Sequence, residues 1–217
     1  MLYFVGVGPG DPELMTLKAA RTLREADAIA LADRGAAMQI AGAWIEGKPV
    51  LKLNMPMKGD RAAWEDAHRT AAAQLSEWLE RYDKIAYLVL GDPGVYASSS
   101  YLLRLLAPRH DCRVVPGVPA MCAAAAELCI PLCEQRERLT VLDNFDVEEI
   151  LPEGNVVVMK SGRNIDDLRA ATRDREAYAV RNLGMADGWA GRLSEMPESA
   201  YSYFTTVLVK EAARSKG

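Results

Sequence analysis

One apolar strand that runs directly into a glycine-rich turn constrains this chain more than any other feature. Residues 85–90 (Ile-Ala-Tyr-Leu-Val-Leu) form an unbroken apolar run of strand length, which is typical of a parallel strand covered on both faces. The turn at 91–94 (Gly-Asp-Pro-Gly) follows, and the serines at 98–100 can cap a helix after it. Open α/β sheets bind ligands at the carboxyl ends of their strands. The turn therefore predicts either a ligand site around Asp92 or a simple strand-to-helix connection.

The first half of the chain repeats this alternation of strands and helices, which indicates a mostly parallel sheet. Thr16 and Asp60 precede amphipathic helical patterns and are expected to cap those helices. A further helix is expected at 36–44. The expected strands are 2–7, 27–32, 49–53, 85–90 and 112–115.

The second half contains further strand-like and helical segments. Helices are expected at 121–128, at 147–151 and around Ile165, Leu168 and Ala171. The expected strands are 139–142, 155–160, 177–182 and 203–209. We therefore predict an α/β protein of two lobes with mostly parallel central sheets. The predicted boundaries are an N-terminal α/β domain at 1–114 and a C-terminal α/β domain at 115–217.

The glycine-rich loop after the first strand raises the question of dinucleotide binding. Gly6 and Gly8 match the first two glycines of a G-x-G-x-x-G motif, but Asp11 stands where the third glycine is needed. A carboxylate at that position would repel a pyrophosphate. The loop therefore argues against a nicotinamide-dependent oxidoreductase.

Composition and charge make several other classes unexpected. The chain of 217 residues is 50% hydrophobic and has a formal net charge of −4, and no run of Lys and Arg suggests a nucleic-acid partner. Four cysteines without a C-x-x-C pair, together with two histidines, offer no metal-ligand spacing, so no metal site is expected. No apolar run reaches the length of a bilayer span, and the first residues lack the basic segment of a signal peptide. We expect a cytoplasmic protein without a membrane partner.

Four short signatures in one order resemble the tetrapyrrole (corrin/porphyrin) methyltransferase family. They are Val-Gly-Val-Gly-Pro-Gly-Asp at 5–11, Leu-Gly-Asp-Pro-x-x-Tyr at 90–96, Val-Pro-Gly at 115–117 and Met-Lys at 159–160. The resemblance extends over almost the whole chain. Further stretches resemble one branch, the precorrin-2 C-20 methyltransferases: 11–19, 56–57, 158–163, 181–185 and 203–209.

The resemblance implies a fold, a cofactor and a reaction. Members look like two α/β domains, usually homodimeric, with S-adenosylmethionine (SAM) held in the cleft between the domains. The implied activity is SAM-dependent methylation of C-20 of precorrin-2 or cobalt-precorrin-2 in corrin (cobalamin) biosynthesis, with S-adenosylhomocysteine as the second product. Methylation at another corrin position or of another substrate is the alternative within the family, and a non-catalytic tetrapyrrole carrier is the alternative outside it. Any cobalt would arrive inside the substrate.

The resemblance also implies roles for individual residues. Near the reacting carbon we place Asp92, Lys160 and Tyr203, where a carboxylate could take up the proton that the carbon loses and Lys160 or Tyr203 could orient the macrocycle. Relatives carry Thr or Ser where Pro119 and Ala120 stand, which leaves only backbone contacts there. The expected cofactor contacts are Pro9, Gly91, Asp92, Val95, Tyr96, Pro119, Ala120, Met159, Asn182, Leu183 and Thr205. The candidate partners for substrate carboxylates are Lys52, Lys58, Arg61, Arg163 and Arg181.

Overall fold

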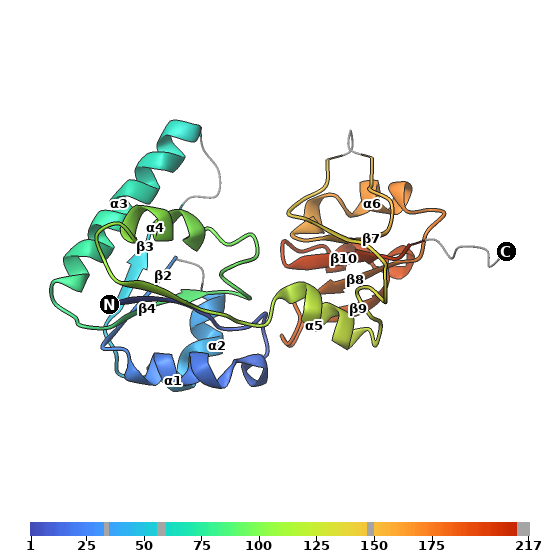
Figure 1. Ribbon diagram of the computed structural model, residues 1–217. Coiled ribbons are helices and arrows are strands. Elements are labelled where there is room, and N and C mark those ends of the chain that lie inside the picture. The colour runs from blue at the N-terminus through green and yellow to red at the C-terminus, as the bar shows by residue number, and fades with distance from the viewer. Residues whose placement is uncertain (33–34, 56–59, 147–149, 212–217) are drawn as a thin grey trace. The chain divides into compact units, whose positions relative to one another are not determined.

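The protein consists of two compact units, Met1–Pro119 and Ala120–Gly217. A computed structural model describes residues 1–32, 35–55, 60–146 and 150–211 (Figure 1). The stretch 56–57, Lys58 and residues 147–149 of the expected helix lie outside the described residues, and residues 150–151 are not helical. Each unit is built on its own five-stranded sheet.

The sheet of the first unit is parallel throughout, in the order β3-β2-β4-β1-β5. Each strand up to β4 is followed by at least one helix before the next strand begins, which explains the parallel direction. The α/β class and the parallel sheet predicted for this half are confirmed. The strands are β1 (Leu2–Gly6), β2 (Ala28–Ala32), β3 (Val50–Leu53), β4 (Ile85–Val89) and β5 (Cys112–Val115).

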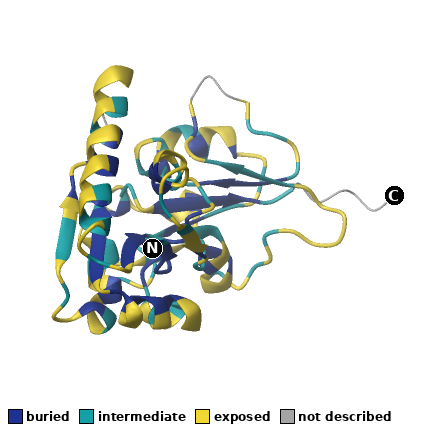
Figure 2. Ribbon diagram, turned by 60° about the vertical axis from the view of Figure 1, so that its left-hand side comes forward, coloured by how far each residue is buried: buried dark blue, intermediate teal, exposed yellow. Residues whose placement is uncertain are grey.

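Helices cover both faces of this sheet. The helices α1 (Leu17–Glu25) and α2 (Ala36–Ile45) pack on one face, and α3 (Arg61–Leu79) and α4 (Ser99–Leu106) pack on the other (Figure 1). Successive side chains alternate between the faces, so Phe4 joins the core under α3 and α4 while Val5 joins the core under α1 and α2. Every residue of β4 is buried, which confirms that this strand is covered on both sides. Figure 2 shows that exposed residues gather on the outer sides of the helices.

Two of the three expected helix caps are present. The Thr16 hydroxyl accepts a hydrogen bond from the Ala19 N–H at 3.1 Å, and the Asp60 carboxylate accepts one from the Ala63 N–H at 2.8 Å. The expected serine cap of α4 is wrong, because Ser98 has helical backbone angles and makes no capping hydrogen bond.

The second unit has a mixed sheet in the order β6-β7-β10-β8-β9, and only β6 and β7 pair in parallel. α5 (Ala120–Glu127) packs on one face of the sheet, and α6 (Ile165–Ala171) packs on the other (Figure 1). The strands are β6 (Leu139–Leu142), β7 (Asn155–Val158), β8 (Ala177–Arg181), β9 (Trp189–Arg192) and β10 (Thr205–Val209).

The mostly parallel sheet expected for the second lobe is therefore wrong, and the connections give the physical reason. The chain reverses direction in the β8–β9 hairpin, and β9 and β10 then both run opposite to β8. β10 inserts between β7 and β8 and runs antiparallel to both. β9, which pairs with β8 as a hairpin, was not predicted from the sequence.

Across the described parts of the chain, no helix combines the length and the apolar character that a membrane crossing needs.

Three glycines at the carboxyl ends of β1, β4 and β5 bring backbone directly against backbone. A Cβ atom added to Gly6 would lie 2.6 Å from the Gly117 nitrogen, and one added to Gly117 would lie 2.1 Å from the Gly91 carbonyl oxygen. These atoms belong to the backbone and cannot move aside as a flexible side chain can. We call the packing of Gly6, Gly91 and Gly117 the glycine contact.

We expect Gly117→Ala to lower the free energy of unfolding by about 2 kcal/mol or more, because the new methyl group would overlap the Gly91 carbonyl. Gly42→Ala is the matched control, since Gly42 is exposed in α2 and nothing lies within 4 Å of an added Cβ. That variant should gain about 0.5–1 kcal/mol. Urea unfolding followed by circular dichroism measures both, and equal stability of the two variants would contradict the close contact.

Candidate functional site

The residues predicted for the site lie in strand-end turns of both units. In the first unit they follow the carboxyl ends of β1, β4 and β5, and in the second unit they follow β7 and β8 or begin β10. Because β10 is antiparallel to β7 and β8, its first residues lie at the same edge of the sheet as the ends of those two strands. Ala120 is the first residue of α5. The first-unit set is Pro9, Gly91, Asp92, Val95, Tyr96 and Pro119, and the second-unit set is Ala120, Met159, Lys160, Asn182, Leu183, Tyr203 and Thr205.

Asp92 connects two turns of the first unit through its carboxylate. Oδ1 accepts the Gly94 N–H at 2.6 Å within its own turn, and Oδ2 accepts the Gly117 N–H at 2.8 Å from the turn after β5. Hydrogen bonds from N–H groups to a charged carboxylate are stronger than neutral ones. Asp92 therefore fixes the positions of both turns relative to each other.

The glycine-rich loop after β1 joins the same arrangement. The Gly91 N–H donates to the Gly8 carbonyl at 2.7 Å, and Pro9 is buried beside it. Asp11, which stands where a dinucleotide motif needs glycine, accepts the Glu13 N–H at 2.8 Å and caps the 3-10 helix Pro12–Leu14. Its carboxylate thus has a local structural role.

Three of the predicted site residues that are not glycine have a left-handed backbone. Tyr96, Lys160 and Asn182 have φ angles of 45°, 58° and 46°. Within the described ranges, Cys129 and Gln135 are the other non-glycine residues with positive φ. Such a conformation costs on the order of 1–3 kcal/mol and is found mainly where the surrounding structure imposes it, often at functional sites. The strained backbone thus coincides with the candidate site in each unit.

Lys160 forms an ion pair with a residue that the sequence analysis did not single out. Its Nζ lies 2.5 Å from Oδ1 of Asp143, and the two side chains are 30% and 48% exposed. Asp143 directly follows β6, and Lys160 lies two residues beyond β7. A partly exposed pair of this kind contributes about 0–1 kcal/mol to stability, so its geometry matters more than its energy.

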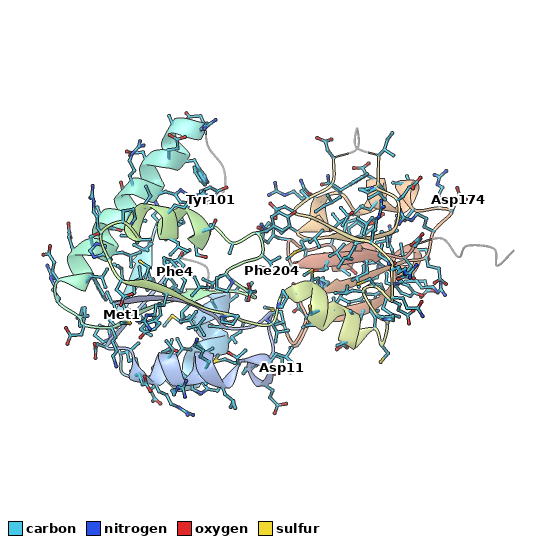
Figure 3. The ribbon with its side chains drawn as sticks, viewed as in Figure 1. Met1, Phe4, Asp11, Tyr101, Asp174 and Phe204 are labelled. Atoms are coloured by element: carbon cyan, nitrogen blue, oxygen red, sulfur yellow. The ribbon has the colours of Figure 1, made fainter. Side chains whose placement is uncertain are left out.

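The turn that carries Lys160 packs tightly against the segment that leads into β10. A Cβ atom on Gly162 would lie 1.8 Å from the Ser202 carbonyl oxygen. Tyr203 and Phe204 follow, with their rings edge to face at 5.3 Å between centroids. Phe204 is 38% exposed (Figure 3). The segment that packs against the Lys160 turn therefore carries an aromatic pair, Tyr203 and Phe204.

Asn182 and Thr205 form hydrogen bonds with the same segment. The Ser202 hydroxyl donates to Oδ1 of Asn182 at 3.1 Å, and Nδ2 of Asn182 donates to Asp187 at 2.8 Å. The hydroxyl of the buried Thr205 donates to the Ser202 carbonyl at 2.6 Å. Ser202 therefore connects the turn after β8 with the start of β10.

The predicted cationic residues have different environments. The Arg181 guanidinium contacts Asp187 and the Ser199 carbonyl, and Arg61 pairs with Glu65 on α3 at 2.9 Å. Lys52 is exposed on β3, and Arg163 is exposed in the 3-10 helix Ser161–Arg163. Within the part of the chain that the structure describes, no group of three or more His, Cys, Asp or Glu side chains could hold a metal ion.

Comparison with known proteins gives consistent matches over most of the chain. The model of the Tetrapyrrole (Corrin/Porphyrin) Methylases matches residues 1–197. The "Probable cobalt-precorrin-2 C(20)-methyltransferase" of Methanocaldococcus jannaschii is 30% identical over 190 residues, which cover 82% of this chain and 80% of that protein. The precorrin-2 C(20)-methyltransferase of Sinorhizobium sp is 30% identical over 229 residues, which cover 94% of this chain and 93% of that protein.

Solved structures show the same fold at lower sequence identity. A cobalamin synthesis related protein (CobF) from Corynebacterium diphtheriae has a TM-score of 0.77 at 22% identity, with 98% of each chain covered. Uroporphyrin-III C-methyl transferase from Thermus thermophilus, complexed with S-adenosylhomocysteine, has a TM-score of 0.65 at 23% identity, with 98% of this chain and 93% of that chain covered.

We expect Asp92→Asn to lower the free energy of unfolding by about 1–3 kcal/mol, because the amide has one acceptor oxygen where the carboxylate satisfies two N–H groups. Asp111→Asn is the control, since its carboxylate is 55% exposed and lies 3.6 Å from Arg113. That change should stay within about 0.5 kcal/mol. If urea unfolding gives the same loss for both variants, Asp92 does not hold the two turns together.

Proposed function

Because this chain belongs to the tetrapyrrole (corrin/porphyrin) methylase family, we propose that it is a SAM-dependent C-methyltransferase that methylates C-20 of precorrin-2 or cobalt-precorrin-2. One observation supports this reaction most directly. The similarity to a precorrin-2 C(20)-methyltransferase extends over 94% of this chain and 93% of that protein. The match is therefore to a complete methyltransferase of that specificity and not to one shared motif.

The strand-end turns fit a cofactor of this kind. Backbone groups in such turns can bind the adenine and ribose of SAM, and the partly buried Met159 and Leu183 offer apolar surface beside them. The Thr205 hydroxyl is engaged with Ser202, so we assign Thr205 a backbone contact. SAM would supply a methyl group made electrophilic by its sulfonium sulfur. The family resemblance implies that turns of both units contact SAM.

The protein's part in such a reaction is mainly alignment in a site that excludes water. Asp92 holds the turns after β4 and β5 in place through two N–H groups. Each of its oxygens has a further lone pair, so the same carboxylate can receive the proton that the methylated carbon loses. We therefore assign Asp92 both a structural and a proton-accepting role.

Lys160 and Tyr203 orient the macrocycle in this proposal. Both come from the tightly packed segments around Gly162, and so neither side chain has to order a mobile loop when substrate arrives. The net charge of −4 does not attract a polyanion in general, so binding depends on local cations. Arg163 is an exposed candidate on the same turn as Lys160.

A cytoplasmic homodimer completes the proposal, on the basis of the family resemblance. The alternative within the family is methylation at another corrin position or of another tetrapyrrole.

Incubation with methyl-labelled SAM and either precorrin-2 or cobalt-precorrin-2 should give a product heavier by one methyl group, with the label at C-20. Mass spectrometry and NMR of the product measure the mass and the position. A label at any other carbon would contradict the C-20 assignment while keeping the methyltransferase. Macrocycle binding without turnover would instead indicate a carrier.

Isothermal titration calorimetry should detect binding of S-adenosylhomocysteine and none of NADH. The reason is that Asp11 places a carboxylate in the loop where a nicotinamide dinucleotide needs its pyrophosphate. Binding of NADH in place of S-adenosylhomocysteine would overturn the cofactor assignment.

A further inference from the structure

We propose that Asp143 is a positioning residue, which holds the Lys160 ammonium at the carboxyl edge of the second sheet so that Lys160 binds a carboxylate side chain of the tetrapyrrole. The inference rests on the proposed function and deepens it by naming the group that recognises the substrate. Asp143 lies outside all four sequence signatures that resemble the family.

The pairing of two neighbouring strands brings the two side chains together. β6 and β7 run in parallel with Leu142 opposite Val158, and the Met159 N–H donates to the Leu142 carbonyl at 2.8 Å. Asp143 and Lys160 follow these partners on their own strands. The ion pair at 2.5 Å is thus set by strand register, not by the chance meeting of two long surface side chains.

The backbone around Lys160 is also fixed by specific contacts. The residue adopts left-handed angles of φ 58° and ψ 32° before the 3-10 helix Ser161–Arg163. The Ser161 hydroxyl donates to the Val158 carbonyl at 2.7 Å, and Gly162 packs against the Ser202 carbonyl. A lysine on a rigid turn, with its ammonium fixed by a carboxylate, is preorganised to bind an anion.

The anion that Lys160 would bind is a carboxylate of the substrate. The macrocycle carries carboxylate side chains, and an ammonium group can donate three hydrogen bonds, so Lys160 can hold Asp143 and a substrate carboxylate together. Arg181, a rival cation in the same unit, has a less exposed side chain than Lys160, 16% against 30%.

Steady-state kinetics of the full chain with cobalt-precorrin-2 and SAM tests the assignment. Asp143→Asn should raise the KM for cobalt-precorrin-2 about fivefold or more, with kcat and the KM for SAM within about twofold of wild type. Lys160→Gln should do the same, and the double variant should be no worse than Lys160→Gln alone. Asp143→Glu, which keeps the charge, should restore most of the affinity.

The matched control is Glu176→Gln, which removes the exposed ion pair to Arg192 at 3.7 Å from the opposite edge of the same sheet. It should leave the KM for cobalt-precorrin-2 unchanged. Thermal melting of all variants should agree within about 2 °C, which separates positioning from loss of folding.

Two failures are distinguishable. If wild type is active and Asp143→Asn behaves like Glu176→Gln, or if the two single effects add in the double variant, the role of Asp143 is wrong and the proposed function stands. If wild type methylates neither precorrin-2 nor cobalt-precorrin-2, the proposed function fails and the role of Asp143 fails with it.

Discussion

Close backbone packing at the carboxyl ends of β1, β4 and β5 is the constraint on which the first half of the candidate site depends. The glycine contact leaves no space for a side chain, and the Asp92 carboxylate ties the turn after β4 to Gly117 in the turn after β5. Turns held this way lose little further freedom when a ligand binds. The first unit therefore presents strand-end backbone groups in a preformed arrangement.

In the second unit, the turns of the candidate site contain residues with strained backbone angles. Lys160 and Asn182 adopt left-handed angles, and the contacts around Ser202 hold the turns that contain them. Strain of this size persists only when surrounding contacts outweigh it. Both units thus have left-handed, non-glycine backbone at the edge where the family motifs lie. This is consistent with a site whose main task is to align the reactants.

Local sequence patterns were sufficient to predict the strand directions of the first sheet but not those of the second. Alternation of strands with helices favours parallel pairing, so the pattern up to residue 115 predicts the strand direction. The run at 203–209 predicts a strand but not its direction, which is set by the reversal of the chain in the β8–β9 hairpin. β9 was missed because Trp-Ala-Gly-Arg is short and contains glycine. Asp92 and Lys160 were found from their motifs, but Asp143 depends on the register of β6 with β7, which no local pattern reveals.

A crystal structure of the protein with S-adenosylhomocysteine bound would show which turns hold the cofactor. We expect the ligand to contact the turn after β4, which contains Asp92, and also the turn after β8, which contains Asn182 and Leu183. Binding at the opposite edge of either sheet, or to one unit alone, would contradict this expectation.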